Sequence, residues 1–118
     1  MPLSITSTAG GTGYADIRVG DSHNVHQMLF DVSAITADSD GYIPPGLPLL
    51  ADGSAVSGAD QTATGVVGPE PVKEGAADHF GNVILDGALN RDMIEDNLGR
   101  SLSANELTAL ANGGFTLV

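Results

Sequence analysis

Short apolar runs divided by glycine and proline dominate residues 25–87. Runs of this length, with turn residues between them, are typical of the strands of a small barrel or sandwich. We predict one strand in "VHQMLFDVSAI", one or two in "GYIPPGLPLLA", one in "ATGVVGPEPV" that ends at Gly68-Pro69, and one in "GNVILDG". The middle of the chain is therefore expected to form a compact, mostly β body.

The second of these runs is interrupted by Pro44, Pro45, Gly46 and Pro48. A proline fixes φ and has no N–H to donate, so it is confined to sheet edges, bulges and corners. We predict that these four residues form a stiff structural corner that guides one short strand into the next. The Asp52-Gly53 turn after the corner is expected to lie at the surface and to vary freely.

The pattern becomes helical after residue 89. Asn90 is a suitable N-cap for "RDMIEDNL", and Gly99 is placed to end that helix. Ser103 and Glu106 have the spacing of a capping box, which predicts a second helix in "ANELTALAN". The tail "FTLV" alternates apolar and polar residues, so we expect it to return as a last strand.

The start of the chain is rich in serine, threonine and glycine and has few large apolar side chains. Leu3 and Ile5 alternate with polar neighbours as in a strand, but the glycines of residues 10–13 then break any regular element. We predict an extended N-terminal arm in residues 1–24 and a single compact domain in residues 25–118. The fold is expected to be mainly β with short helices (α+β), as a small β-barrel or β-sandwich-like domain with two short C-terminal helices.

Composition narrows the range of partners. Asp and Glu number 15 against 4 Lys and Arg, which gives a formal net charge of −11 at pH 7. Such a surface repels nucleic-acid phosphates and anionic membranes and favours a cationic protein partner, so we predict no direct nucleic-acid or membrane binding. We expect no membrane span and no cleaved signal, because no apolar run is long enough. The absence of cysteine excludes disulfides and thiolate metal sites.

Candidate catalytic and metal-binding residues are few. His23 and His26 stand three apart with Asp31 nearby, but no third and fourth ligand occur at a metal-site spacing. Residues 36–43 ("TADSDGYI") resemble part of a calcium loop, but Leu47 stands where the closing glutamate belongs. We therefore predict no metal, no cofactor and no catalytic residues, and a structural or binding protein rather than an enzyme.

The order of the segments resembles that of the head decoration (cement) proteins of tailed bacteriophages, in the lambda-type family. A polar N-terminal stretch is followed by "IPPGLPLLADGSAV", "ATGVVGPEPVKEG" and "GNVILDGALN". The strand motif A-x-G-(I/V)-(L/V) of that family is matched here by Ala63, Gly65, Val66 and Val67. A short terminal strand after a helical segment, here "GFTLV", also fits, and the resemblance covers most of residues 25–118.

This resemblance implies a mostly β domain that forms a homotrimer on the outer capsid surface of the virion, after synthesis in the host cytoplasm. Its partner would be the major capsid protein, whose neighbouring subunits it would clamp against the pressure of packaged DNA. The arm would become ordered on a capsid subunit. The arm residues Pro2, Leu3, Ser4, Ile5 and Thr6 are suited to add a strand to an exposed sheet edge, and a trimer would add avidity.

Two other functions remain open from the sequence. One is a small β-barrel binding module of a non-viral protein complex, although 2 Tyr and 3 Phe offer little stacking surface for a sugar. The other is a small metal-dependent enzyme that uses His23 and His26. Metal analysis of the purified protein distinguishes this enzyme from the two binding functions.

Overall fold

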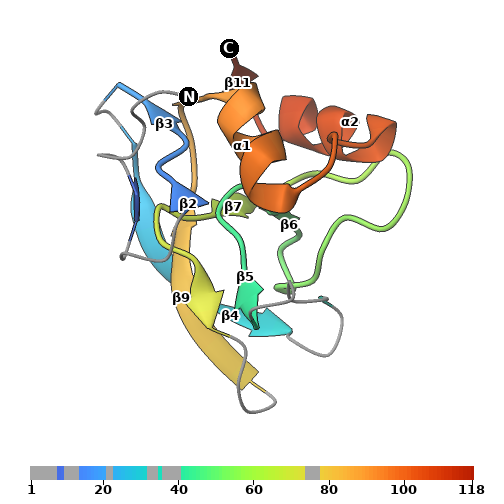
Figure 1. Cartoon of the computed structure of the whole chain (residues 1–118). Helices are drawn as coiled ribbons and strands as arrows, with labels where there is room; N and C mark the ends of the chain where they lie inside the picture. Colours follow the sequence, from blue (N-terminus) through green and yellow to red (C-terminus); the bar gives the residue numbers. More distant parts are fainter. Residues whose placement is uncertain (1–7, 10–13, 21–22, 32–34, 36–40, 74–77) are drawn as a thin grey trace.

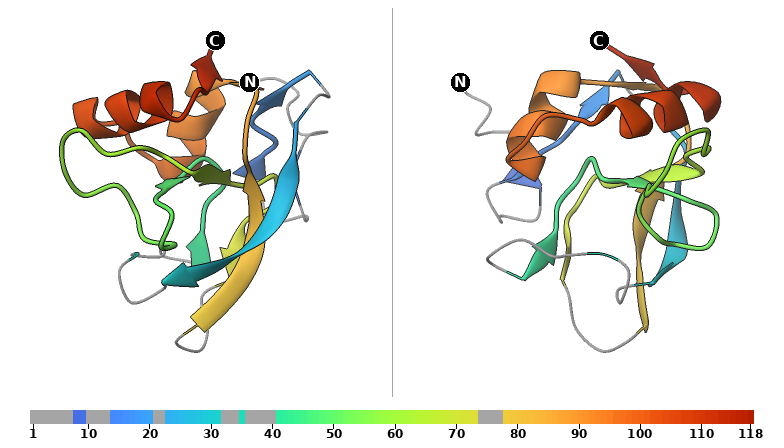
Figure 2. Two further views of the ribbon diagram at one scale, coloured as in Figure 1. Left: turned by 180° about the vertical axis from the view of Figure 1, so that it is seen from behind. Right: turned by 90° about the vertical axis from the view of Figure 1, so that its right-hand side faces the viewer.

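The fold consists of short strands and two helices, with both helices at one end of the molecule (Figures 1 and 2). The computed structural model describes residues 8–9, 14–20, 23–31, 35, 41–73 and 78–118. The helices are α1 (Arg91–Leu98) and α2 (Ala104–Asn112). The strands are β1 (Thr8–Ala9), β2 (Tyr14–Ala15), β3 (Arg18–Val19), β4 (Val25–Asp31), β5 (Tyr42–Ile43), β6 (Pro48–Leu49), β7 (Gly65–Val67), β8 (Val72–Lys73), β9 (Asp78–Ile84), β10 (Ala88–Leu89) and β11 (Thr116–Leu117). The predicted class, α+β and mainly β, is confirmed.

The largest sheet has the strand order β4-β9-β7-β6, and its neighbouring strands are antiparallel. β4 and β9 are paired along all 7 residues of each strand, so together they form a long ribbon. β7 pairs with Val83 and Ile84 at the C-terminal end of β9. Among the described strands, the sheet is therefore four strands wide near the helices and narrows to the β4–β9 ribbon away from them (Figure 1).

A second sheet, of order β11-β10-β3, brings β3 beside strands from the C-terminal part of the chain. β3 is antiparallel to β10, whereas β11 is parallel to it, with α1 and α2 forming the crossover that a parallel pair requires. The predicted return of the tail as a last strand is confirmed by this pairing. β1 with β2, and β5 with β8, form two further antiparallel pairs.

The core is aliphatic and has two parts. One part lies beneath the helices and includes Ile84, Ile94 and Leu110. The other lies around the short strands and includes Leu49 and Val67. Complete burial of one such side chain contributes about 1.5–3 kcal/mol, so this packing is the main source of stability.

The proline–glycine corner of residues 43–49 is buried between these two parts of the core. Gly46 has a φ of +112°, and a Cβ there would stand 2.8 Å from Cγ2 of Ile94 in α1, so glycine alone suits the position. The N–H of Gly46 donates to the carbonyl of Val67 at 2.8 Å. Pro48 belongs to β6 and lies opposite Val66 of β7. Because β6 is an edge strand, the missing N–H of Pro48 is tolerated there.

The Asp52-Gly53 turn differs from the expected freely variable turn. Gly53 is buried with a φ of +85°, and its N–H donates to the carbonyl of Leu50 at 2.9 Å. Asp52 is exposed and accepts a hydrogen bond from the backbone N–H of Ser54 at 3.0 Å. Because a positive φ strongly favours glycine, only the Asp52 half of this turn is open to change.

Both predicted helices are confirmed, together with their caps. Asn90 Oδ1 accepts from the N–H of Met93 at 3.1 Å, and Gly99 ends α1 in the left-handed region with a φ of 73°. Ser103 and Glu106 each bond to the backbone N–H of the other, which completes the predicted capping box of α2. In the described part of the chain, no helix has the length and apolarity needed to cross a bilayer.

The predicted arm boundary at residue 24 is wrong for residues 14–20. Ile17 is 0% exposed and belongs to the core beneath the helices, and β3 pairs with β10. Ile17 and Val19 alternate with polar neighbours over too few residues to give a clear periodicity, so the sequence did not reveal this contact. The compact domain therefore includes residues 14–20.

Candidate protein interface

The predicted arm residues, Pro2 to Thr6, lie outside the described residues. The described chain begins just after them with β1, which pairs with β2 through Thr8↔Ala15 and Ala9↔Tyr14. β2 also contacts α1. β1 is therefore connected to the helical end of the domain through β2.

Asn97 in α1 fixes this arm base, β1 and β2, to the rest of the fold. Its side-chain Oδ1 accepts from the N–H of Ala15 at 3.0 Å, and its Nδ2 donates to the carbonyl of Ala15 at 2.9 Å. The same Nδ2 lies 3.3 Å from the carbonyl of Pro45. One side chain thus joins the arm base, the corner and α1, and sequence reasoning missed it because the partners are 82 and 52 positions away.

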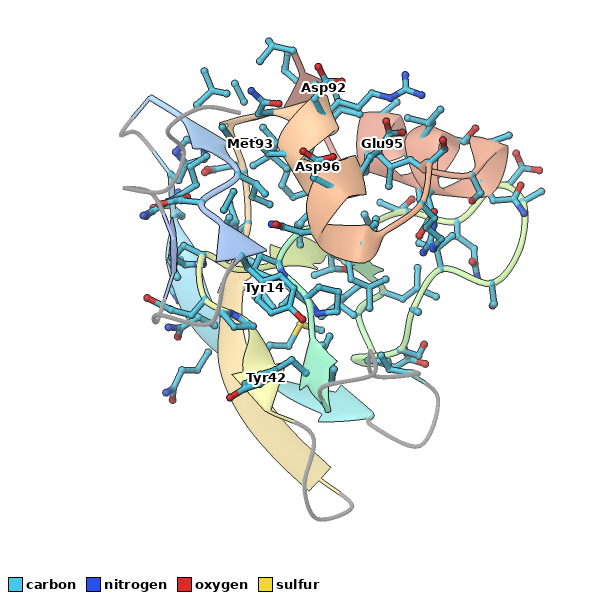
Figure 3. The ribbon with its side chains drawn as sticks, in the orientation of Figure 1. Tyr14, Tyr42, Asp92, Met93, Glu95 and Asp96 are labelled. Atoms are coloured by element: carbon cyan, nitrogen blue, oxygen red, sulfur yellow. The ribbon has the colours of Figure 1, made fainter. Side chains whose placement is uncertain are left out.

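Two tyrosines lie side by side next to this contact. The rings of Tyr14 and Tyr42 are 6.3 Å apart between centroids at an interplanar angle of 66°, which is an edge-to-face arrangement (Figure 3). Both residues are half-buried. Such an arrangement is favourable for aromatic rings, and tyrosine is enriched at protein interfaces because it combines apolar area with a polar tip.

Acidic side chains project from α1 on the same side of the molecule (Figure 3). Asp92 and Asp96 are exposed and one helical turn apart, so their like charges oppose each other. Asp96 also lies in the last turn, where the helix dipole disfavours an anion and where no basic residue is present. A cationic group placed over this helix would relieve both effects. We call Tyr14, Tyr42, Asp92 and Asp96 the tyrosine–aspartate face.

The arginines among the described residues are all engaged within the chain. Arg18 pairs with Asp16 at 2.7 Å, Arg91 with Glu95 at 3.2 Å, and Arg100 with Glu106 at 2.7 Å. None of these pairs includes a residue of the tyrosine–aspartate face. Lys73, the remaining basic residue of the chain, lies opposite Tyr42 in the β5–β8 pair, so the negative charge of this face is that of Asp92 and Asp96 on α1.

The pair of Arg100 and Glu106 has a structural role. Glu106 is 5% exposed, and its two carboxylate oxygens accept from Arg100 at 2.7 and 2.9 Å. Burial alone would raise the pKa of Glu106, but the hydrogen bonds from Arg100 and Ser103 outweigh it and hold that pKa below its usual range. The pair fixes the start of α2 against the loop between the two helices.

The two histidines are not brought together as a metal site. His23 Nε2 lies 2.7 Å from the carbonyl oxygen of Ala88, and its Nδ1 is buried without a partner. His26 is exposed on β4. Groups of three or more His, Cys, Asp or Glu positioned for a metal do not occur in the described residues. Of the calcium-like segment, residues 36–40 lie outside that part, and Leu47 belongs to the core.

Comparison of the chain with protein-family models, with curated protein sequences and with solved structures gave no match. The candidate interface therefore stands on the geometry described above.

Proposed function

We propose that this protein is a capsid decoration (cement) protein of a tailed bacteriophage. It binds the outer capsid surface as a homotrimer and stabilises the shell against internal DNA pressure. Its N-terminal arm adds to a capsid subunit, and it acts without catalysis. The major capsid protein is its partner.

The observation that carries the proposal is that the segments that resemble the decoration-protein family lie next to one another in the fold. "IPPGLPLLADGSAV" supplies β6, "ATGVVGPEPVKEG" supplies β7, and "GNVILDGALN" supplies the end of β9, and these three strands are neighbours in one sheet. "GFTLV" supplies β11, which comes after the helices and pairs with β10. The resemblance therefore falls on segments that build the domain together, rather than on unconnected surface loops.

The arm base supports the proposed mode of attachment. A cement protein transmits tension from its anchor to its body, so the anchor must be joined to rigid structure. β2 is held to α1 and to the corner through Asn97, at three backbone groups. The adjacent tyrosine–aspartate face offers aromatic area and negative charge, which suit a second contact with a cationic protein surface.

Removal of the arm alone tests the proposal. A chain that starts at Thr8 keeps β1, so it is expected to melt like the full chain and to lose saturable addition to undecorated shells. The Leu3→Ser, Ile5→Ser double variant is the matched control, because it keeps the arm's length and removes only its apolar side chains. We expect it to weaken addition and to leave the melting temperature unchanged.

Shell binding is measured by co-sedimentation, and shell stability by resistance to heat. Sedimentation of the free protein should show three copies of the 11.9 kDa chain. A full chain that does not add to shells would refute the function. An arm-less chain that adds as well as the full chain would refute the arm mechanism alone.

A further inference from the structure

β4 ends the largest sheet with an outer edge that no described strand covers. The strand is 7 residues long, and its inner edge is fully paired with β9. In an edge strand, the backbone groups of alternate residues are directed outwards and lack a partner strand. The edge is therefore a ready site for an added strand.

The register identifies which backbone groups point outwards. The N–H of Leu85 donates to the carbonyl of Asn24 at 2.8 Å, so Asn24 is directed towards β9. Alternation then directs the backbone of His26 and Met28 to β9, and that of Val25 and Gln27 to the open edge. The other side of β9 agrees with this assignment, because the carbonyl of Asn82, opposite Gln27, accepts from Gly68 beside β7 at 3.1 Å.

β4 lacks most of the features that normally block an edge, although a charged residue, Asp31, stands at its last position. Natural sheets protect their edges with proline, lysine, bulges or very short strands. Residues 25–31 contain neither proline nor lysine, and their pairing with β9 is continuous, without a bulge. The opposite edge strand, β6, has 2 residues and contains Pro48.

The charge of the chain indicates what kind of strand would bind. A second copy of β4 would bring Asp31 and no lysine or arginine to this edge, so self-pairing gains no favourable pair of opposite charges. The exposed side chains in its first half, His26 and Gln27, are compatible with a neutral or cationic neighbour. These features favour an extended segment of a different polypeptide that carries lysine or arginine.

We infer that the β4 edge accepts a strand of the major capsid protein, an inference that rests on the proposed function. Figure 2 shows β4 on the side of the molecule away from α1, and the arm base and the tyrosine–aspartate face lie with α1. A molecule with attachment sites on opposite sides can hold two neighbouring capsid subunits at once. It would donate a strand to one subunit and accept a strand from the other.

Gln27→Pro tests the inference. The N–H of Gln27 faces the open edge, so proline there removes a donor to the added strand without removing a bond to β9. We expect the affinity for undecorated shells to fall about tenfold or more. Gln27→Thr is the matched control, because it changes the side chain, keeps the N–H and suits a strand, and it should bind like the unaltered chain.

Hydrogen exchange of the unaltered chain provides a readout that needs no variant. The peptide that covers residues 25–31 should gain protection when shells are added. Weaker binding by Gln27→Pro but not by Gln27→Thr, with this added protection, supports the inference. Equal binding by both variants, or no added protection, overturns it and leaves the proposed function standing. An unaltered chain that does not add to shells overturns both.

Discussion

The two edges of the largest sheet are built differently. β6 is 2 residues long, both of them buried, and it is joined to the proline–glycine corner that packs against α1. β4 is 7 residues long and extends with β9 into a ribbon away from the helices (Figure 1). The first edge is closed by the fold itself, whereas among the described strands the second is left open.

Because of this difference, the β6 edge mainly affects the stability of the fold, whereas the β4 edge mainly affects what the sheet can bind. At β6, substitutions disturb the close packing of the core, because the neighbouring side chains shift too little to fill a gap or to accommodate an extra methyl group. At β4, half of the backbone groups face outwards, so changes there affect what the sheet can bind more than whether it folds. A substitution should therefore have very different consequences at the two edges.

The largest effect is expected from Gly46→Val at the closed edge. Its left-handed φ and its contact with Ile94 disfavour any side chain, so we expect the free energy of unfolding to fall by about 3 kcal/mol or more. Gly58→Ala is the control, because nothing lies within 4 Å of a Cβ there, and it should change stability by less than about 0.5 kcal/mol. Urea denaturation measures both. Equal stability of the two variants would mean that the corner is loosely packed.

Two proline substitutions compare the two sides of the open edge strand. His26→Pro removes an N–H that is directed to β9, so we expect it to lower the free energy of unfolding by about 3 kcal/mol. Gln27→Pro removes an outward N–H and is expected to cost less than about 1 kcal/mol, since an edge strand tolerates proline there. Thermal melts measure the difference. Similar losses in both variants would show that the register assigned to β4 is wrong.

A smaller effect is expected from acid, which acts on the pair of Arg100 and Glu106 at the helical end. Burial alone would raise the pKa of Glu106, but the hydrogen bonds from Arg100 lower it by a larger amount. The pKa of Glu106 is therefore lower in the folded protein than in the unfolded chain. Stability from this pair is therefore present above about pH 4.3, the ordinary glutamate pKa, and is lost as the pH falls through the lower folded value. Glu106→Gln should lower the free energy of unfolding by about 1–2 kcal/mol at pH 7. It should also make the loss of stability at acidic pH less steep, which a series of unfolding measurements at different pH values would show. An unchanged acid limb would contradict this role.

The elements predicted from the sequence are those fixed by contacts between near neighbours in the chain. The caps at Asn90 and Ser103 act over three residues, and Pro44 and Gly68 directly follow the short strands β5 and β7. The contacts that the sequence did not reveal join distant segments. Ala15 binds Asn97 across 82 positions, and Ile17 reaches the core from a polar stretch. Neither contact leaves a periodic pattern, because it depends on how the sheets and helices pack.

The smallest perturbation, amide exchange in the unaltered protein, resolves the two edges residue by residue. The N–H groups of His26 and Met28 are directed to β9 and should exchange slowly, whereas those of Val25 and Gln27 face the open edge and should exchange much faster. Val67 provides the reference at the closed edge, since its N–H donates to the carbonyl of Leu47 at 3.0 Å within the core. Exchange followed by nuclear magnetic resonance measures each site. Uniform protection along β4 would mean that the outer edge is already covered in the free protein, and it would remove the physical basis for strand addition there.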